Sequence, residues 1–87
     1  MHETLNVKEV NIKLVKELTD KGTKYILLQD KSADFTFDNM INAINLFADK
    51  GWKCVNIAAY AHGERLGLDN IMYALLQHPY VKNAEML

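Results

Sequence analysis

The residues best suited to chemistry lie within one short segment, 61–70. It collects His62, Glu64, Arg65 and Asp69, together with two glycines. An imidazole that titrates near neutral pH can act as a general base, and a guanidinium can hold a carboxylate or a phosphate. Segments that follow a strand often carry such groups on a rigid scaffold. The same composition is typical of a solvated connection between two strands, and that interpretation is favoured because catalysis needs groups that converge from several elements.

Two aromatic residues precede this segment and extend the candidate site. The predicted ligand-binding residues are Trp52, Tyr60, His62, Glu64 and Arg65. They would hold a small molecule that bears a carboxylate or a phosphate. An enzyme that uses His62 with Glu64 is the less favoured alternative, and we predict neither catalytic residues nor a cofactor. Tyr73 could join Trp52 and Tyr60 as a stacking platform for bases, but Trp52 after a helix more often seals that helix against a sheet.

Metal and nucleotide motifs are missing from the sequence. The three histidines His2, His62 and His78 are spread along the whole chain, without a His-x-x-His or Cys-x-x-Cys pair, so no metal site is expected. The glycines Gly63 and Gly67 lack the Lys-Ser/Thr that completes a phosphate-binding loop.

Composition and charge narrow the classes of protein further. The chain has 87 residues, of which 49% are hydrophobic and 24% charged, and its net charge is -1. One domain over residues 1–87 is expected, with residues 1–6 and 83–87 flexible. The near-neutral charge argues against nucleic-acid binding. No signal peptide or apolar run of about 18 residues is present, so we expect a cytoplasmic protein. The only cysteine, Cys54, is expected to be a core thiol.

Hydrophobic spacing predicts three elements directly. A helix is predicted over 36–50, because apolar residues recur there with the period of one helical face. Thr36 or Asp38 could cap its start, and Gly51 suits a left-handed helix end. Strands are predicted over 24–29 and 52–60, and the second of these alternates between an apolar and a mixed face.

Two segments admit a helix or a strand. Residues 7–18 fit a helix, with Asn6 and Glu9 as a capping pair, or a strand that pairs with the next one. An internal sequence similarity favours the helix. Residues 18–26 match residues 47–55, where a predicted helix leads through Lys-Gly into a predicted strand. Residues 71–77 form an apolar run of strand length that also fits a helix.

The order of these segments resembles a family of small bacterial β-α-β-β domains of unknown function. The resemblance covers about residues 24–80 and is carried by the helix that leads into Gly51-Trp52 and a strand, followed by a last strand that ends in a basic residue and Pro79. The chain departs from the family pattern at His78, where Arg or Lys is usual, and in residues 1–23, which have no counterpart. The resemblance implies that residues 71–76 form a strand of an antiparallel sheet, and it implies no established activity.

Together these observations predict an α+β fold. It consists of a small antiparallel sheet of three or four strands against one long helix, with an additional N-terminal helix or strand. Two of the strands are apolar on both faces, and one helix covers only one face of a sheet. The other face must meet residues 7–18 or another chain, so we predict a homodimer or higher homo-oligomer. The leading hypothesis is a homo-oligomeric interaction or regulatory module without catalytic activity. A protein partner is a further candidate for its surface, and no membrane association is expected.

Overall fold

The computed structural model describes residues 2–32, 37–61 and 70–80. The elements in chain order are β1 (His2–Asn6), a 3-10 turn η1 (Val7–Glu9), α1 (Ile12–Lys21), β2 (Tyr25–Ser32), α2 (Asp38–Ala48), β3 (Lys53–Ala61) and β4 (Asn70–Gln77). The chain is a small α+β domain, and its segment from β2 to β4 has the β-α-β-β order that the sequence suggested.

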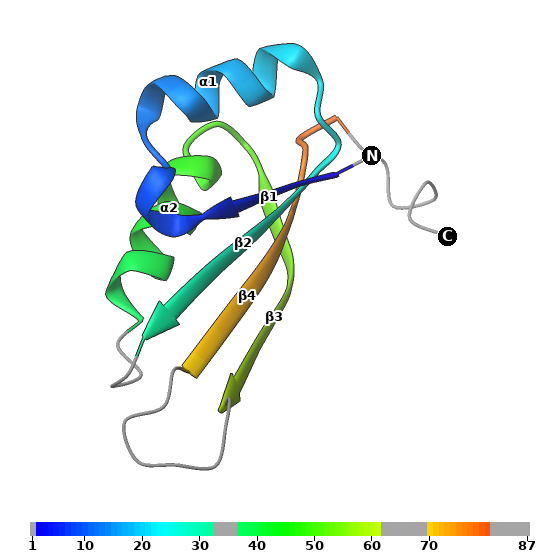
Figure 1. Cartoon of the computed structure of the whole chain (residues 1–87). Coiled ribbons are helices and arrows are strands. Elements are labelled where there is room, and N and C mark those ends of the chain that lie inside the picture. Colours follow the sequence, from blue (N-terminus) through cyan, green and yellow to red (C-terminus); the bar gives the residue numbers. More distant parts are fainter. Residues whose placement is uncertain (1, 33–36, 62–69, 81–87) are drawn as a thin grey trace.

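The strands form one four-stranded sheet in the order β1-β2-β4-β3 (Figure 1). β1 runs parallel to β2, whereas β4 is antiparallel to both β2 and β3. The prediction of a purely antiparallel sheet is therefore wrong: α1 serves as the crossover that a parallel β1–β2 pair requires. The prediction of one long helix is also wrong, because α2 with 11 residues is hardly longer than α1 with 10.

The predicted helix over 36–50 is confirmed as α2. Its buried residues are Met40, Ala43 and Phe47, which lie on one face at helical spacing. Asp38 occupies the first turn, where a negative charge interacts favourably with the helix dipole. Gly51 has φ of 88°, the left-handed conformation that glycine adopts at low cost.

The helix alternative is confirmed for the N-terminal segment, although the helix begins later than predicted. The side chain of Asn6 accepts a hydrogen bond from the Lys8 amide and caps η1. Asn11 then caps α1, because its Oδ1 accepts from the Leu14 amide at 2.9 Å. Two short capped elements therefore occupy the segment that the sequence pattern treats as one. Residues 2–6, for which the sequence predicted no element, form β1.

The strand alternative is confirmed for residues 71–77, which belong to β4. Met72, Ala74 and Leu76 are buried, whereas Ile71, Tyr73 and Leu75 alternate with them and are half-buried on the other face. This alternation shows that one face of β4 lies in the core and the other does not.

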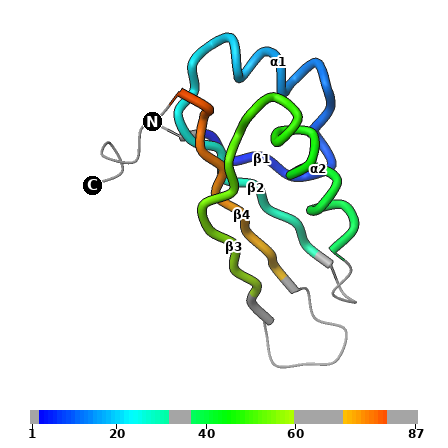
Figure 2. The backbone as a smooth tube through the Cα atoms, turned by 180° about the vertical axis from the view of Figure 1, so that it is seen from behind, coloured from blue at the N-terminus to red at the C-terminus, as the bar shows by residue number. Residues whose placement is uncertain are grey.

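Both helices lie on the same side of the sheet. Figures 1 and 2 show α2 against the sheet and α1 beside the upper end of α2. The core cluster joins residues from both helices to the inner positions of the strands, among them Val15, Leu18, Ile26, Leu28, Met40, Phe47, Trp52, Ala74 and Leu76. Residues 7–18 therefore do not cover the second face of the sheet. No helix in the described part of the chain is long and apolar enough to cross a membrane.

Candidate interaction surface

Of the five residues that the sequence grouped into one ligand site, the structure describes Trp52 and the backbone of Tyr60. Trp52 lies in the core, with 4% of its surface exposed. The backbone of Tyr60 belongs to β3 and pairs with Ile71 of β4. His62, Glu64 and Arg65 lie outside the described residues, so a ligand site there stays a prediction. The interpretation of Trp52 as the seal between helix and sheet is supported by its burial.

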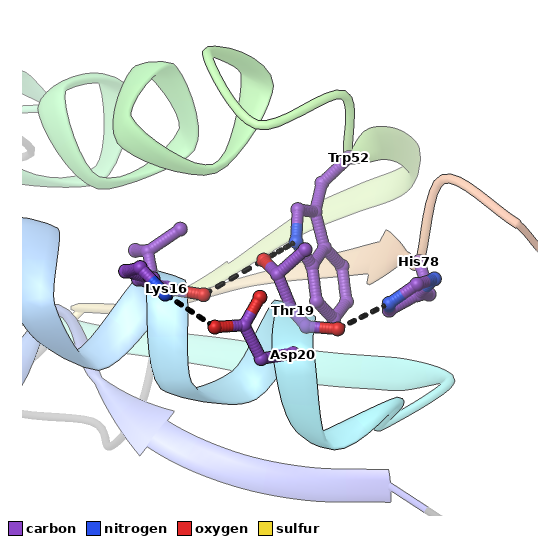
Figure 3. Close-up of polar contacts among 6 residues, drawn as sticks. Lys16, Thr19, Asp20, Trp52 and His78 are labelled. Atoms are coloured by element: carbon purple, nitrogen blue, oxygen red, sulfur yellow. Dashed lines mark hydrogen bonds and ion pairs between the residues drawn. The ribbon is translucent and has the colours of Figure 1, made fainter.

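Trp52 is held by a hydrogen-bond chain to α1. Its indole Nε1 donates to the Oγ1 of Thr19 at 2.7 Å, and that hydroxyl donates to the carbonyl of Val15 at 2.7 Å (Figure 3). The ring also meets Phe47 edge to face, with centroids 5.2 Å apart. A buried indole N–H needs such an acceptor, so this contact fixes the exit of α2 against α1.

His78 completes this cluster from the end of β4. Its Nε2 lies 2.9 Å from the carbonyl oxygen of Thr19 (Figure 3). Its Nδ1 accepts a hydrogen bond from the Tyr80 amide at 3.1 Å. A carbonyl only accepts and an amide N–H only donates, so Nε2 must carry the proton. Both ring nitrogens are therefore used within the fold, and the buried imidazole has a positioning role.

Charged contacts among the described residues lie mainly at the surface. Lys16 pairs with Asp20 one turn along α1, and Lys21 pairs with Glu3 of β1 at 2.8 Å. The hydrogen bond to Asp20, and then the attraction of its charge, raise the pKa of the Lys16 ammonium. Lys16 is fully exposed, so this pair contributes little to the stability of the fold. The second pair ties the end of α1 to the parallel edge of the sheet.

The most distinctive surface feature is an apolar groove between α2 and β3. Its volume is about 310 Å³, and its lining residues are Phe37, Met40, Ile41, Ile57, Ala58, Ala59 and Met72. All of these side chains are apolar. Phe37, Ile41 and Ile57 are 41%, 52% and 55% exposed, although large apolar residues are usually buried. Three of the five large exposed apolar residues in the described chain thus meet in one place.

The groove lies beside β3, the last strand at one edge of the described sheet. Ile57 and Ala59 pair with Ala74 and Met72 of β4, which places them on the helix-covered face. Charged side chains on an edge strand discourage pairing with another chain, yet β3 carries a charge only at its first residue, Lys53. The edge and the groove therefore form one continuous surface suited to another polypeptide.

A bulge in β3 places Cys54 on a different face of the strand from the one that the sequence predicted. The pairing with β4 shifts between Cys54 and Asn56, so the strand contains one extra residue at this point. Cys54 and Ile57 consequently both lie opposite core residues of β4, whereas simple alternation places them on opposite faces. The prediction of a core thiol is wrong: Cys54 is exposed because it lies at the edge of the sheet.

The groove could be foreseen only in part. The sequence pattern places Ile41 on the apolar face of the helix and Ile57 on the apolar face of the strand, and both were therefore expected in the core. Their exposure depends on how far α2 extends beside the edge of the sheet, which periodicity does not reveal. In the described residues, no group of three or more His, Cys, Asp or Glu side chains is placed to hold a metal ion.

Comparison of the sequence with known proteins identified no relative. No family model matches the chain, and no curated protein matches it significantly.

Proposed function

We propose that the chain is a homo-oligomeric interaction or regulatory module of the cytoplasm, without catalytic activity. The observation that carries this proposal is the convergence of Phe37, Ile41 and Ile57 on one apolar groove. A contiguous exposed apolar surface is characteristic of protein association sites. A second copy of the same chain is the simplest partner, since most soluble oligomers are symmetric assemblies of identical chains.

The chemistry of the groove favours a polypeptide over a small polar metabolite. Sites for small ligands combine an apolar lining with a few placed polar groups that orient the ligand. The side chains that line this groove are all apolar. The partner must therefore be recognised through apolar contact and through the backbone of β3.

The resemblance to small bacterial β-α-β-β domains agrees with this proposal. The helix that leads into Gly51-Trp52 and then into a strand supports kinship with that family at the level of sequence pattern. That family has no established activity, so the resemblance adds no catalytic role.

The test is the mass of the chain in solution, measured by light scattering coupled to size exclusion from low to high micromolar concentrations. We expect a mass above the 10.0 kDa of one chain, which decreases on dilution. Ile41→Glu should shift the protein towards monomer, because it places a charge in the apolar groove. Ile12→Glu is the matched control, since Ile12 is 68% exposed on α1 and does not line the groove. A monomer at all concentrations would refute the proposal.

A further inference from the structure

We propose that two copies of the chain associate through β3, which pairs antiparallel with β3 of the partner subunit so that one sheet continues across both copies. This inference rests on the proposed self-association and names the surface that performs it. The groove between α2 and β3 of each copy then lies next to the groove of the other.

The first support is the backbone of β3. In the described sheet β3 is hydrogen-bonded to β4 on one side only, and it stands at the edge. Its residues after the bulge, from Asn56 to Ala61, pair with β4 in regular register. A regular edge strand presents a row of amide and carbonyl groups that can accept a further strand. No charged side chain interrupts this segment.

The second support is the match between the faces. A twofold axis perpendicular to the sheet makes neighbouring strands antiparallel and keeps the helix-covered faces of both copies on the same side. Residues opposite one another must then share a face, which places the axis on a residue of β3. An axis at Ala58 sets Ile57 opposite Ala59 of the partner subunit, so a large side chain meets a small one. It also leaves the bulge near Cys54 outside the paired segment.

The third support is the absence of charge from the paired part of the edge. From Asn56 to Ala61, β3 carries no charged side chain, so two copies of this segment meet without repulsion between like charges. Lys53, the one charged residue of β3, lies five positions from the axis at Ala58 and outside the paired segment. An uncharged strand edge that is regular and compatible with itself favours a second copy as the occupant.

The experiment is disulfide cross-linking in a Cys54→Ser background. A single cysteine is introduced as Ile57→Cys, Ala58→Cys or Ala59→Cys, and the matched control is Thr4→Cys, an exposed position on the opposite edge strand, β1. Under mild oxidation we expect Ala58→Cys to form the covalent dimer fastest and Thr4→Cys to form almost none. Ile57→Lys should raise the dissociation constant of the dimer about tenfold or more, while Ile12→Lys leaves it unchanged.

The native cysteine allows a second measurement that needs no substitution. With a spin label on Cys54, an axis at Ala58 predicts a separation of roughly 25–30 Å between the two Cα atoms, from about 3.3 Å per residue along the paired strands. A dimer with this separation and the cross-linking order above supports the proposal. A dimer in which no cysteine in 57–59 cross-links, or in which Ile57→Lys has no effect, overturns β3 pairing while leaving self-association intact. A protein that is monomeric at all concentrations overturns both.

Discussion

The indole Nε1 of Trp52 donates a 2.7 Å hydrogen bond to the Oγ1 of Thr19, so the residue that follows α2 is anchored to the last turns of α1. The carbonyl of Thr19 also accepts from His78 at the end of β4. One residue thus connects three segments that are far apart in the sequence, and its side chain and backbone serve different partners.

The first prediction concerns this side chain. Thr19→Val preserves the shape of the side chain but leaves the buried indole N–H of Trp52 without its acceptor. We expect the free energy of unfolding, measured by urea denaturation, to fall by about 1–3 kcal/mol. The control is Thr4→Val at an exposed position of β1, which should change stability by no more than about 0.5 kcal/mol. Equal effects of the two substitutions would show that the indole bond contributes nothing specific.

The second prediction concerns the tautomer of His78. Its hydrogen bonds require the proton on Nε2, with Nδ1 accepting from the Tyr80 amide. We expect two-dimensional ¹H–¹⁵N spectra of the imidazole at pH 8 to show a protonated Nε2 and an unprotonated Nδ1. His78→Leu should lower the free energy of unfolding by about 0.5–1.5 kcal/mol, because the Thr19 carbonyl loses one of its two donors and the Tyr80 amide loses its acceptor. A proton on Nδ1 would contradict the arrangement.

The third prediction compares two glycines that share a positive φ. Gly22 and Gly51 have φ of 80° and 88°, so alanine at either position is expected to destabilise the fold by about 1–2 kcal/mol. A Cβ at Gly51 would also lie 3.2 Å from the Cβ of Pro79, whereas one at Gly22 would have no neighbour within 4 Å. Gly51→Ala should therefore lower the thermal midpoint more than Gly22→Ala. The reverse order would mean that the contact with Pro79 relaxes without cost.

The fourth prediction concerns the cap of α1. Asn11→Ala removes the side chain that accepts from the Leu14 amide, and we expect a loss of about 1 kcal/mol in the free energy of unfolding. The same substitution at Asn42, an exposed position within α2, should be neutral or slightly stabilising because alanine has the higher helix propensity. Chemical denaturation of both variants distinguishes a capping effect from a general effect of removing asparagine.

The similarity between residues 18–26 and residues 47–55 shows how much of the fold the sequence could predict. Leu18 and Phe47 are both buried, and each carbonyl accepts a hydrogen bond from the residue five positions later, Thr23 and Trp52 respectively. Gly22 and Gly51 donate to the carbonyls three residues before them. Both segments thus end a helix through the same Schellman arrangement. A helix end of this kind depends on neighbouring residues, so it recurs where the same residues recur. The similarity between the two segments therefore correctly predicted a helix before Gly22.

The features that could not be predicted depend on contacts between distant segments. The parallel pairing of β1 places Leu5 in the core and requires α1 as a crossover, and neither is visible in the first six residues alone. The bulge next to Val55 moves Cys54 to the face of Ile57. The strand contains no glycine or other residue pattern from which this bulge could be predicted. The candidate surface likewise arises because α2 lies beside β3, so its existence depends on tertiary packing.

The cluster of Thr19, Trp52 and His78 gathers the exits of both helices and the end of β4 at one end of the molecule, while the apolar groove lies along the N-terminal half of α2. In the proposed assembly, the residues that stabilise the fold and those that contact the second copy therefore lie in different regions of a very small domain. We expect substitutions at Ile41 or Ile57 to weaken self-association without disturbing the hydrogen bonds that maintain the fold. In that arrangement the interface can change in sequence while the architecture is kept.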